Sequence, residues 1–539
     1  MLPLKRLSLL VLAVWHGALA AQQFDVRVFG AGSGLPSATV DAIREDSLGY
    51  LWVNTAGGLC RFDGHRFEIW TTAMGPPPKE IGAFLQPLDS TYATACTNSG
   101  PHPDGIVAQT WINDRQGNKW IGRTDGAWRI GPRPLIHLSA TNGLGHNDVL
   151  CMHEDRSGAI WIATAFGGLA RFTSDACINF TERDGLRART VSAVHRTHHG
   201  ALWIGTSGGG VTRSDSTGVR SFGVREGLTD GYVTCLAEHT DGSLLVGTVA
   251  HGLFLWNGSR FEQPAWASSL MNTHINRIRS CGDTALWIAA EGGVFVMHRN
   301  GMMQRWNGYE EAATDVLVDG ERTWIGREDG LGYYVNGRSV PYRDRDRDLP
   351  AGVQVNALAM DGSGNIWVAT DGSGLWKMAE NGLKQFTTRD GLSSDRVEQV
   401  LLDAYDNIWV GTARGFDVLE FDVLQEQLLE VRHYGTDDGF IGSEAFRNAC
   451  FLDRDSTLWF GTVDGATRFD PDRVMTIDAS PRTHITEVLL NYEKVDWGPW
   501  CAGVGANGLP IALSLPFDMN HLSFGFVGLS LASQEQVRY

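Results

Sequence analysis

Apolar positions along the chain recur in short runs that alternate with glycine-containing turns. Residues 365–377, NIWVATDGSGLWK, place a tryptophan in a run of apolar and β-branched residues and follow it directly with a turn. Nearly the same phrase begins at Tyr50, Ala159, Ala201 and Asn407. Recurrence at a regular spacing indicates a repeat architecture.

The tryptophan of this phrase sets the register of the repeat. It occurs at Trp52, Trp120, Trp161, Trp203, Trp287, Trp324, Trp367, Trp409 and Trp459, and Leu245 fills the place between Trp203 and Trp287. From Trp120 onward the successive spacings are 41, 42, 42, 42, 37, 43, 42 and 50 residues. The first spacing, 68 residues, leaves room for one decayed unit beside the ten clear ones.

Each unit predicts four short strands. A Gly-Leu loop such as DGLSSDRV (390–397) leads into an apolar run, an Asp/Gly turn, the tryptophan strand, a second glycine turn and two further short strands. Four strands in roughly 42 residues are typical of a propeller blade. Both faces of the tryptophan strand are apolar or small, as blades packed face to face require. The predicted fold class is all-β, with tandem β-propellers of about 10–11 four-stranded blades.

More than eight blades exceed one usual ring, so the sequence predicts two rings. We place the first β-propeller at residues 24–265 and the second at 266–478, with the boundary near EQPAWASSLMN (262–272). One larger or incomplete ring is the alternative that the repeat spacing leaves open.

The first residues differ from the rest of the chain. Lys5 and Arg6 precede a 14-residue apolar-rich stretch that ends in Ala18-Leu19-Ala20. This order is typical of a Sec-type signal peptide, predicted at residues 1–20. A retained signal anchor is the rival interpretation, but a membrane span needs roughly twenty residues. We therefore expect an exported chain.

Charge and cysteine spacing exclude two classes of partner. The formal charge is −17, or −19 without Lys5 and Arg6, which argues against nucleic acid because phosphate binding needs clustered cations. The eight cysteines form no CxxC pair, so no metal site is predicted. Cys151 is interpreted as a small buried strand residue.

Catalytic signatures are missing from the sequence. No HExxH, GxSxG or GxxxxGK[ST] motif occurs, so we expect no enzymatic activity and no cofactor in this chain. The SGGG at 207–210 stands at the hairpin position of a repeat and is interpreted as a turn. The aspartates of DRSGAIW and DGSGNIW are expected to hydrogen-bond their own loop backbone.

Binding is expected in the loops that follow Gly-Leu, because these vary while the strands repeat. Variable polar and aromatic side chains on a fixed scaffold are typical of binding loops. Unselected surface variation is the alternative for each residue. The candidate ligand-binding residues are Asn147, Arg189, Tyr232, His274 and Arg396.

The unit GL…V…D..GN.WV.T..GGL.R resembles the two-component regulator propeller repeat. LWFGTVDGATRFDPDRV (458–474) resembles the closing blade of such arrays, and PRTHITEVLLNYEKV (481–495) the first strand of the β-sandwich that follows them. Residues 513–539 resemble the opening of a three-tyrosine (Y_Y_Y) domain. Residues 479–539 are therefore expected to form an incomplete Ig-like β-sandwich, and the chain, stopping at Tyr539, is interpreted as part of a longer reading frame.

The resemblance implies the periplasmic ligand-sensing region of a transmembrane two-component receptor of the inner membrane. It further implies an oligosaccharide ligand, a homodimer through the β-sandwich, and membrane attachment through the missing C-terminal part. The signal would pass through the sandwich to a cytoplasmic output domain, most often a histidine kinase. The alternatives are an exported β-propeller interaction scaffold and a propeller polysaccharide lyase or glycosidase.

Overall fold

The computed structural model consists mainly of short antiparallel strands joined by turns. It describes residues 23–24, 26–82, 108–133, 135–239, 241–281, 285–298, 301–340, 352–379, 382–422, 427–474, 482–505, 509–519, 521–529 and 531. Over these ranges the strands form ten sheets of four or five strands, beside two two-stranded sheets. This confirms the predicted all-β fold built from four-stranded blades.

The chain divides into two compact units. The seven-blade unit comprises residues 1–25 and 175–474, and the three-blade unit comprises residues 26–174 and 475–539. The propeller boundary predicted at 265/266 therefore lies within one unit, between β22 (Phe261–Glu262) and β23 (Ile275–Cys281). The difference arises because the spacing of repeats along the chain does not reveal which blades are neighbours in space.

The seven-blade unit is a ring of seven sheets. The strands of each sheet are named from the innermost to the outermost. The first four are β15 (Val191–Arg196), β16 (Leu202–Thr206), β17 (Gly210–Asp215), β18 (Gly218–Phe222); β19 (Val233–Glu238), β20 (Leu244–Thr248), β21 (Leu253–Trp256), β22; β23, β24 (Ala285–Ala290), β25 (Gly293–His298), β26 (Met303–Arg305); and β27 (Asp315–Asp319), β28 (Arg322–Arg327), β29 (Gly330–Val335), β30 (Arg338–Ser339). The last three are β31 (Val355–Met360), β32 (Ile366–Thr370), β33 (Leu375–Ala379), β34 (Gly382–Phe386); β35 (Val397–Leu402), β36 (Ile408–Thr412), β37 (Gly415–Phe421), β38 (Leu428–Tyr434); and β39 (Ala445–Leu452), β40 (Leu458–Thr462), β41 (Gly465–Phe469), β14 (Cys177–Phe180), β1 (Gln23–Phe24).

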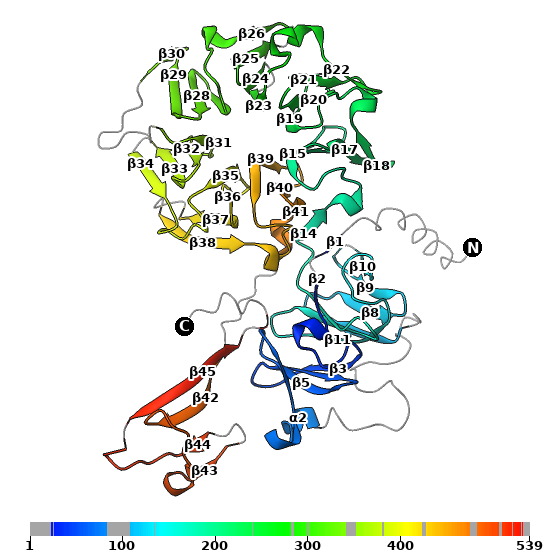
Figure 1. The fold of residues 1–539 in the computed structure, drawn as a ribbon, viewed down its shortest axis with the longest axis vertical. Helices are drawn as coiled ribbons and strands as arrows, with labels where there is room; N and C mark the ends of the chain where they lie inside the picture. Colours follow the sequence, from blue (N-terminus) through cyan, green and yellow to red (C-terminus); the bar gives the residue numbers. More distant parts are fainter. Residues whose placement is uncertain are drawn as a thin grey trace, which may run out of the picture. The chain divides into compact units, whose positions relative to one another are not determined.

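Figure 1 shows these sheets arranged in a circle. The ring is closed because β15 of the first blade packs beside β39 of the last. The outer strand of that last blade, β14, precedes the first blade in the sequence and pairs with β41. The sequence repeat alone would have paired β14 with the strand just before it.

Hydrogen bonds between blades reinforce the ring. The second residue of an inner strand, or its equivalent, donates a side-chain hydrogen bond to a backbone carbonyl at the start of the next blade's inner strand. These bonds join Ser192 to Val233, Thr234 to Ile275, Asn276 to Ala313, Thr314 to Val355, and Asn356 to Val397, at 2.5–2.8 Å. In the sixth blade the buried Glu398 occupies this place, and as a carboxylate it accepts from Arg396 instead.

The three-blade unit uses the same strand exchange. Its sheets are β3 (Val40–Glu45), β4 (Leu51–Thr55), β5 (Gly58–Phe62), β6 (Phe67–Ile69); β7 (Thr110–Asn113), β8 (Lys119–Arg123), β9 (Gly126–Ile130), β10 (Ile136–Leu138); and β11 (Val149–Glu154), β12 (Ile160–Thr164), β13 (Leu169–Phe172), β2 (Val26–Phe29). The blade of β11 lies between the other two, since β11 contacts both β3 and β7. The N-terminal β2 completes it by pairing with β13.

The remaining elements are short. α2 spans Lys79–Gly82, and single 3-10 turns span Ala31–Ser33, Thr72–Met74, Glu182–Asp184, Val224–Glu226, Ala265–Leu270, Trp306–Gly308, Thr436–Asp438, Pro471–Arg473 and Gly498–Trp500. In the predicted sandwich region β42 (Arg482–Leu490) pairs with β45 (Leu522–Leu529), and β43 (Gly503–Val504) with β44 (Pro510–Ile511). Ile81 of α2 and Leu529 of β45 pack on Tyr50 and Trp52, and so cover one face of the β3–β6 blade.

The repeated tryptophan packs between sheets, as predicted. Eight of the nine are buried, as is Leu245, while Trp287 is only partly buried. Six of these indoles also donate Nε1–H to the aspartate six residues earlier, over 2.7–3.2 Å: Trp52 to Asp46, Trp120 to Asp114, Trp161 to Asp155, Trp367 to Asp361, Trp409 to Asp403, and Trp459 to Asp453. The same aspartates accept loop backbone N–H groups, as at Asp46 from Gly49 and Tyr50, which confirms the predicted turn role.

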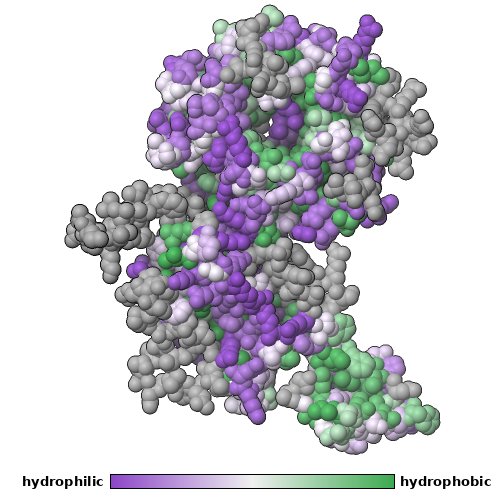
Figure 2. Space-filling model, turned by 180° about the vertical axis from the view of Figure 1, so that it is seen from behind, coloured by the Kyte–Doolittle hydropathy of each residue, from purple (hydrophilic) through white to green (hydrophobic). Residues whose placement is uncertain are grey.

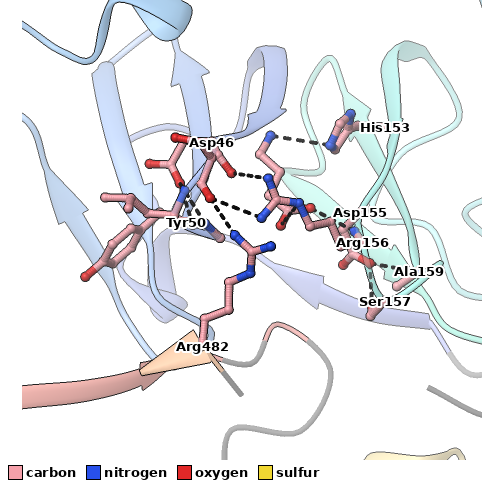
Figure 3. A network of polar contacts seen from close by, with 12 residues as sticks. Asp46, Tyr50, His153, Asp155, Arg156, Ser157, Ala159 and Arg482 are labelled. Carbon is pink, nitrogen blue, oxygen red and sulfur yellow. Dashed lines mark hydrogen bonds and ion pairs between the residues drawn. The ribbon is translucent and has the colours of Figure 1, made fainter. Parts of the chain in front are cut away.

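These turns also join neighbouring blades. Figure 3 shows Arg156 lying between Asp155 and Asp46. Its backbone N–H donates to Glu45 Oε2 over 2.8 Å, and its Nη2 donates to the Asp46 carbonyl over 3.1 Å. Arg482 of β42 donates to the Ser47 carbonyl over 2.6 Å, so the two-stranded sheet of β42 and β45 is attached to the same turn.

Cysteine chemistry and hydropathy add two observations. Cys151 is buried and disulfide-bonded, whereas Cys60, Cys235 and Cys450 are buried free thiols. Among the residues described above, no helix is long and apolar enough to span a membrane. The predicted signal peptide, residues 1–20, lies outside the described residues.

Candidate functional site

A cavity of about 1010 Å³ lies in the seven-blade unit. Figure 2 shows this ring hollowed at its centre. The cavity is lined by the inner strands of four consecutive blades, β39, β15, β19 and β23, together with turns that follow them. It therefore belongs to one rigid sheet assembly, which suits a preformed ligand site.

An irregularity in β39 shapes this cavity. Between the pairs Ala445–Thr462 and Cys450–Phe460, β39 advances five residues while β40 advances two. The corresponding shift in β15 inserts one extra residue, so the β39 bulge is two residues longer. Asn448 lies inside the bulge with φ 57°, a left-handed conformation that asparagine tolerates better than most residues. Bulges of this kind often re-aim side chains at functional sites.

Asn448 and Arg277 meet at the cavity. Arg277 Nη1 donates to the Asn448 carbonyl over 2.6 Å, and Asn448 Nδ2 donates to the Asn356 carbonyl over 3.0 Å. Asn448 is 5% exposed, yet its Oδ1 has no hydrogen-bond partner among the described residues, and neither has Arg277 Nε or His195 Nε2. Buried polar atoms are almost always paired in folded proteins, so these three atoms are candidates to bind ordered water or a polar ligand.

A second arginine on β23 has a complete set of partners. Arg279 binds the fully buried Asp315 through Nε at 2.8 Å and Nη2 at 2.5 Å. Burial favours the neutral form of Arg279, but the charge and hydrogen bonds of Asp315 raise its pKa above the ordinary value. Asp315 also accepts the backbone N–H groups of Val316 and Leu358. This ion pair is therefore internally satisfied.

Burial and neighbouring groups affect several other ionisable side chains of the cavity. Burial lowers the pKa of His195 to about 4, so its imidazole is neutral at pH 7. Burial raises the pKa of Cys235 to about 11, which keeps it a thiol. His198 pairs with Glu238, and His239 with Asp241 at 2.9 Å. At neutral pH the cavity therefore offers hydrogen-bonding groups, among them a neutral imidazole and a thiol.

Four of the five predicted site residues share one rim of the ring. Arg189, Tyr232, His274 and Arg396 each lie one or two residues before an inner strand, namely β15, β19, β23 and β35. Equivalent strands of a propeller run in the same direction, so these residues lie at the same end of it. None of the four lines the cavity, which begins further along the same strands.

The rim residues have protein partners. Arg189 Nη2 contacts Asp464 Oδ1 at 2.5 Å, His274 contacts Glu291 at 3.5 Å, and Tyr232 is 56% exposed. Arg396 Nε contacts Glu398 Oε1 at 2.7 Å, and the charge of Glu398 raises the pKa of Arg396. The rim is therefore already rich in ion pairs.

Asn147 stands apart from these four, in the three-blade unit. Its Oδ1 accepts the backbone N–H of Ala140 over 2.6 Å and so fixes the turn before β11. Asp395 makes the corresponding bond to the Thr388 N–H in the seven-blade unit, over 2.7 Å. This shared geometry explains a short polar side chain at that place.

His433 on β38 pairs with a buried aspartate near the rim. Its Nδ1 lies 2.9 Å from Oδ1 of the fully buried Asp417, whose Oδ2 accepts from the Ser393 N–H and hydroxyl. The hydrogen bond to Asp417 raises the pKa of His433 above its ordinary value.

We expect this pair to stabilise the ring at low pH. A histidine whose pKa is higher in the folded chain than in the unfolded chain stabilises the fold fully at pH values below its unfolded-chain pKa of about 6.5. This stabilisation is lost as the pH rises through the folded-chain pKa. Because the His433 side chain is 45% exposed, the contribution should be about 1 kcal/mol or less. NMR titration of His433 should give a pKa above 6.5 that falls in Asp417→Asn; an unchanged value in the variant would contradict the pairing.

Comparison with known proteins places the repeats in context. Residues 143–166 and 348–372 match the family described as "Two component regulator propeller", which confirms the resemblance found in the sequence. Histidine kinase P4 of Formosa agariphila is 23% identical over 185 residues, which is 33% of this chain and 13% of that protein. The matched stretch is thus a small part of that relative.

One solved structure in particular has a similar fold. The extracellular domain of a putative hybrid two-component system from B. thetaiotaomicron superposes with a TM-score of 0.67 at 16% identity, covering 95% of this chain and 92% of that one. A second such extracellular domain from the same organism gives a TM-score of 0.45 at 16% identity, covering 94% and 74%. The first of these likenesses supports the fold.

Proposed function

We propose that this chain is the ligand-sensing region of a transmembrane two-component receptor. The observation that carries the proposal is the central cavity, with its unpaired Asn448, Arg277 and His195 atoms, in a chain whose repeats match the two-component regulator propeller. The relative named a histidine kinase supports an output domain of that kind in the whole protein. The disulfide at Cys151 fits an exported, periplasmic chain, since disulfides persist in oxidising compartments.

The ligand class and signal route extend this proposal. An oligosaccharide fits a cavity of this size with several hydrogen-bonding groups. Binding can transmit a signal only through a difference in affinity between two arrangements of the receptor. We propose that the sandwich region carries that difference towards the membrane, as part of a homodimer.

The test is a thermal-shift screen of the purified chain against neutral and acidic oligosaccharides, repeated with two variants. Asn448→Gly removes the unpaired Oδ1 and tolerates φ 57°. Tyr232→Ala removes the exposed rim tyrosine instead. We expect a ligand that raises Tm in the parent and in Tyr232→Ala, but at least tenfold weaker binding to Asn448→Gly.

Other outcomes favour other functions. If Tyr232→Ala alone lost binding, the predicted rim residues Arg189, Tyr232, His274 and Arg396 would form the site. If no oligosaccharide shifted Tm, the interaction-scaffold hypothesis would replace sensing. Cleavage of a polysaccharide by the purified chain would instead favour the lyase or glycosidase hypothesis.

A further inference from the structure

We propose that the central cavity recognises a sugar acid, with its carboxylate bound by Arg277 and a hydroxyl bound by Asn448; this assignment rests on the proposed sensing function. The argument begins with Arg277, which is half-buried on β23. No carboxylate lies within 4.0 Å of its guanidinium in the part of the chain that the structure describes, and its Nε has no acceptor.

A half-buried cation at a cavity wall gains from a counter-charge. A carboxylate satisfies a guanidinium through two parallel hydrogen bonds. Arg277 donates from Nη1 to the Asn448 carbonyl, and other N–H groups of its guanidinium remain available to a ligand. A ligand carboxylate would therefore gain a charge-assisted contact that the protein itself does not supply.

Of the two arginines on β23, Arg279 has a counter-charge within the protein and Arg277 has none among the described residues. The two arginines lie two residues apart on β23 and line the same cavity. Arg279 is neutralised by Asp315 and also donates to the Leu358 carbonyl over 2.5 Å. The acidic residues that line the cavity, Glu238 and Asp241, are engaged by His198 and His239.

Asn448 sets a second requirement on the ligand. Its Oδ1 is an acceptor, so it would repel a carboxylate oxygen and bind an O–H or N–H donor. Because the Asn448 carbonyl contacts Arg277, its side-chain acceptor and the guanidinium belong to one site. A molecule with a carboxylate near a hydroxyl satisfies both groups, whereas a neutral sugar satisfies Asn448 alone.

The experiment compares glucuronic acid with glucose, which differ in one carboxylate, by calorimetric titration of the purified chain. We expect glucuronic acid to bind at least tenfold more tightly than glucose. Arg277→Gln should lower the affinity for glucuronic acid at least tenfold and leave that for glucose unchanged. Arg277→Lys, which keeps the charge without the planar fork, should bind with intermediate affinity.

Arg260→Gln is the matched control, because Arg260 is exposed, lies in the turn before β22 and does not line the cavity; this variant should bind glucuronic acid like the parent. Circular dichroism and Tm of each unliganded variant separate lost binding from lost folding. Methyl β-glucuronide distinguishes two sources of the acid: binding tighter than the free acid supports a terminal oligosaccharide residue, and weaker binding supports a free sugar acid.

Equal affinity for glucose and glucuronic acid would overturn the assignment of Arg277 while leaving sensing intact. Equal affinity for inorganic phosphate and glucuronic acid would overturn the sugar assignment, because any anion would then suffice. If neither sugar bound, this inference would fail, and the oligosaccharide screen would still decide the proposed function separately.

Discussion

Replacing Asp453 with alanine is expected to lower the free energy of unfolding of the seven-blade unit by about 3 kcal/mol, the lower end of the cost of breaking a buried ion pair. Asp453 is 5% exposed and accepts hydrogen bonds from Arg196 Nε at 2.6 Å and Trp459 Nε1 at 3.2 Å. The alanine variant leaves a guanidinium and an indole N–H without their acceptor. Urea denaturation followed by tryptophan fluorescence measures the loss.

The neighbouring first blade provides a matched control. Thr197 occupies the place of the aspartate there, six residues before Trp203, and is equally buried at 6% exposure. Its hydroxyl donates to the Ala201 carbonyl at 3.3 Å, a weak hydrogen bond. Thr197→Ala should therefore cost about 1 kcal/mol. Equal losses in the two variants would show that the aspartate–tryptophan bond adds nothing beyond the turn.

Lowering the pH from 7 to 4 should destabilise the seven-blade unit through His195 by roughly 3 kcal/mol, since each pKa unit is worth about 1.4 kcal/mol. Burial lowers the folded-state pKa of His195 to about 4, against about 6.5 in an unfolded chain. Above pH 6.5 the imidazole is neutral in both states. Between 6.5 and 4 only the unfolded chain takes up the proton, so stability falls across that window and levels off below it.

His195→Phe isolates this contribution. Phenylalanine keeps an aromatic ring against Phe451, whose ring centroid lies 5.1 Å from the imidazole. The difference in unfolding free energy between parent and variant should shrink or reverse as the pH falls from 6.5 to 4. A pH-independent difference would mean that the pKa of His195 is the same in the folded and unfolded chains. His153 in the three-blade unit, with its pKa also lowered to about 4 by burial, should behave in the same way.

The blade itself was predictable because its signals are local. The tryptophan strand, the Asp/Gly turn and the glycine hairpin lie within one short stretch of sequence, and each has a fixed backbone preference. The aspartate–tryptophan bond was missed, although the constant spacing of six residues between Asp155 and Trp161 or Asp453 and Trp459 is visible in the sequence. A second role for the indole could have been inferred from it.

The assembly of blades could not be predicted in the same way. Pairing of β14 with β41 joins residues 177–180 to 466–469, and no local preference encodes a partner so distant. The cavity residues were also missed. Arg277 aligns with Ala193, Cys235 and Ala357 of other inner strands, which marks it as unusual, but its lack of a carboxylate partner is visible only in three dimensions.

The unusual length of one repeat indicates, from the sequence alone, that residues are inserted near the bulge in β39. The spacing from Trp409 to Trp459 is 50 residues, eight more than the common 42, and Asn448 falls within it. Sequence reasoning placed the binding residues in the loops before the inner strands because those loops vary most. The Asn448 site lies inside a strand, where inserted residues lengthen the repeat. A comparison of loop residues does not detect such an insertion.

The pairing of β14 with β41 also imposes an order of events on the nascent chain. The ribosome must add the 284 residues between Phe180 and Gly465 before β14 can meet its partner strand. At about 5–20 residues per second, this takes roughly 15–60 s. During that interval the strand edge has no native neighbour, and unpaired edges readily join the wrong chain. Production of this protein should therefore depend on a holding chaperone more strongly than production of a propeller closed by adjacent strands.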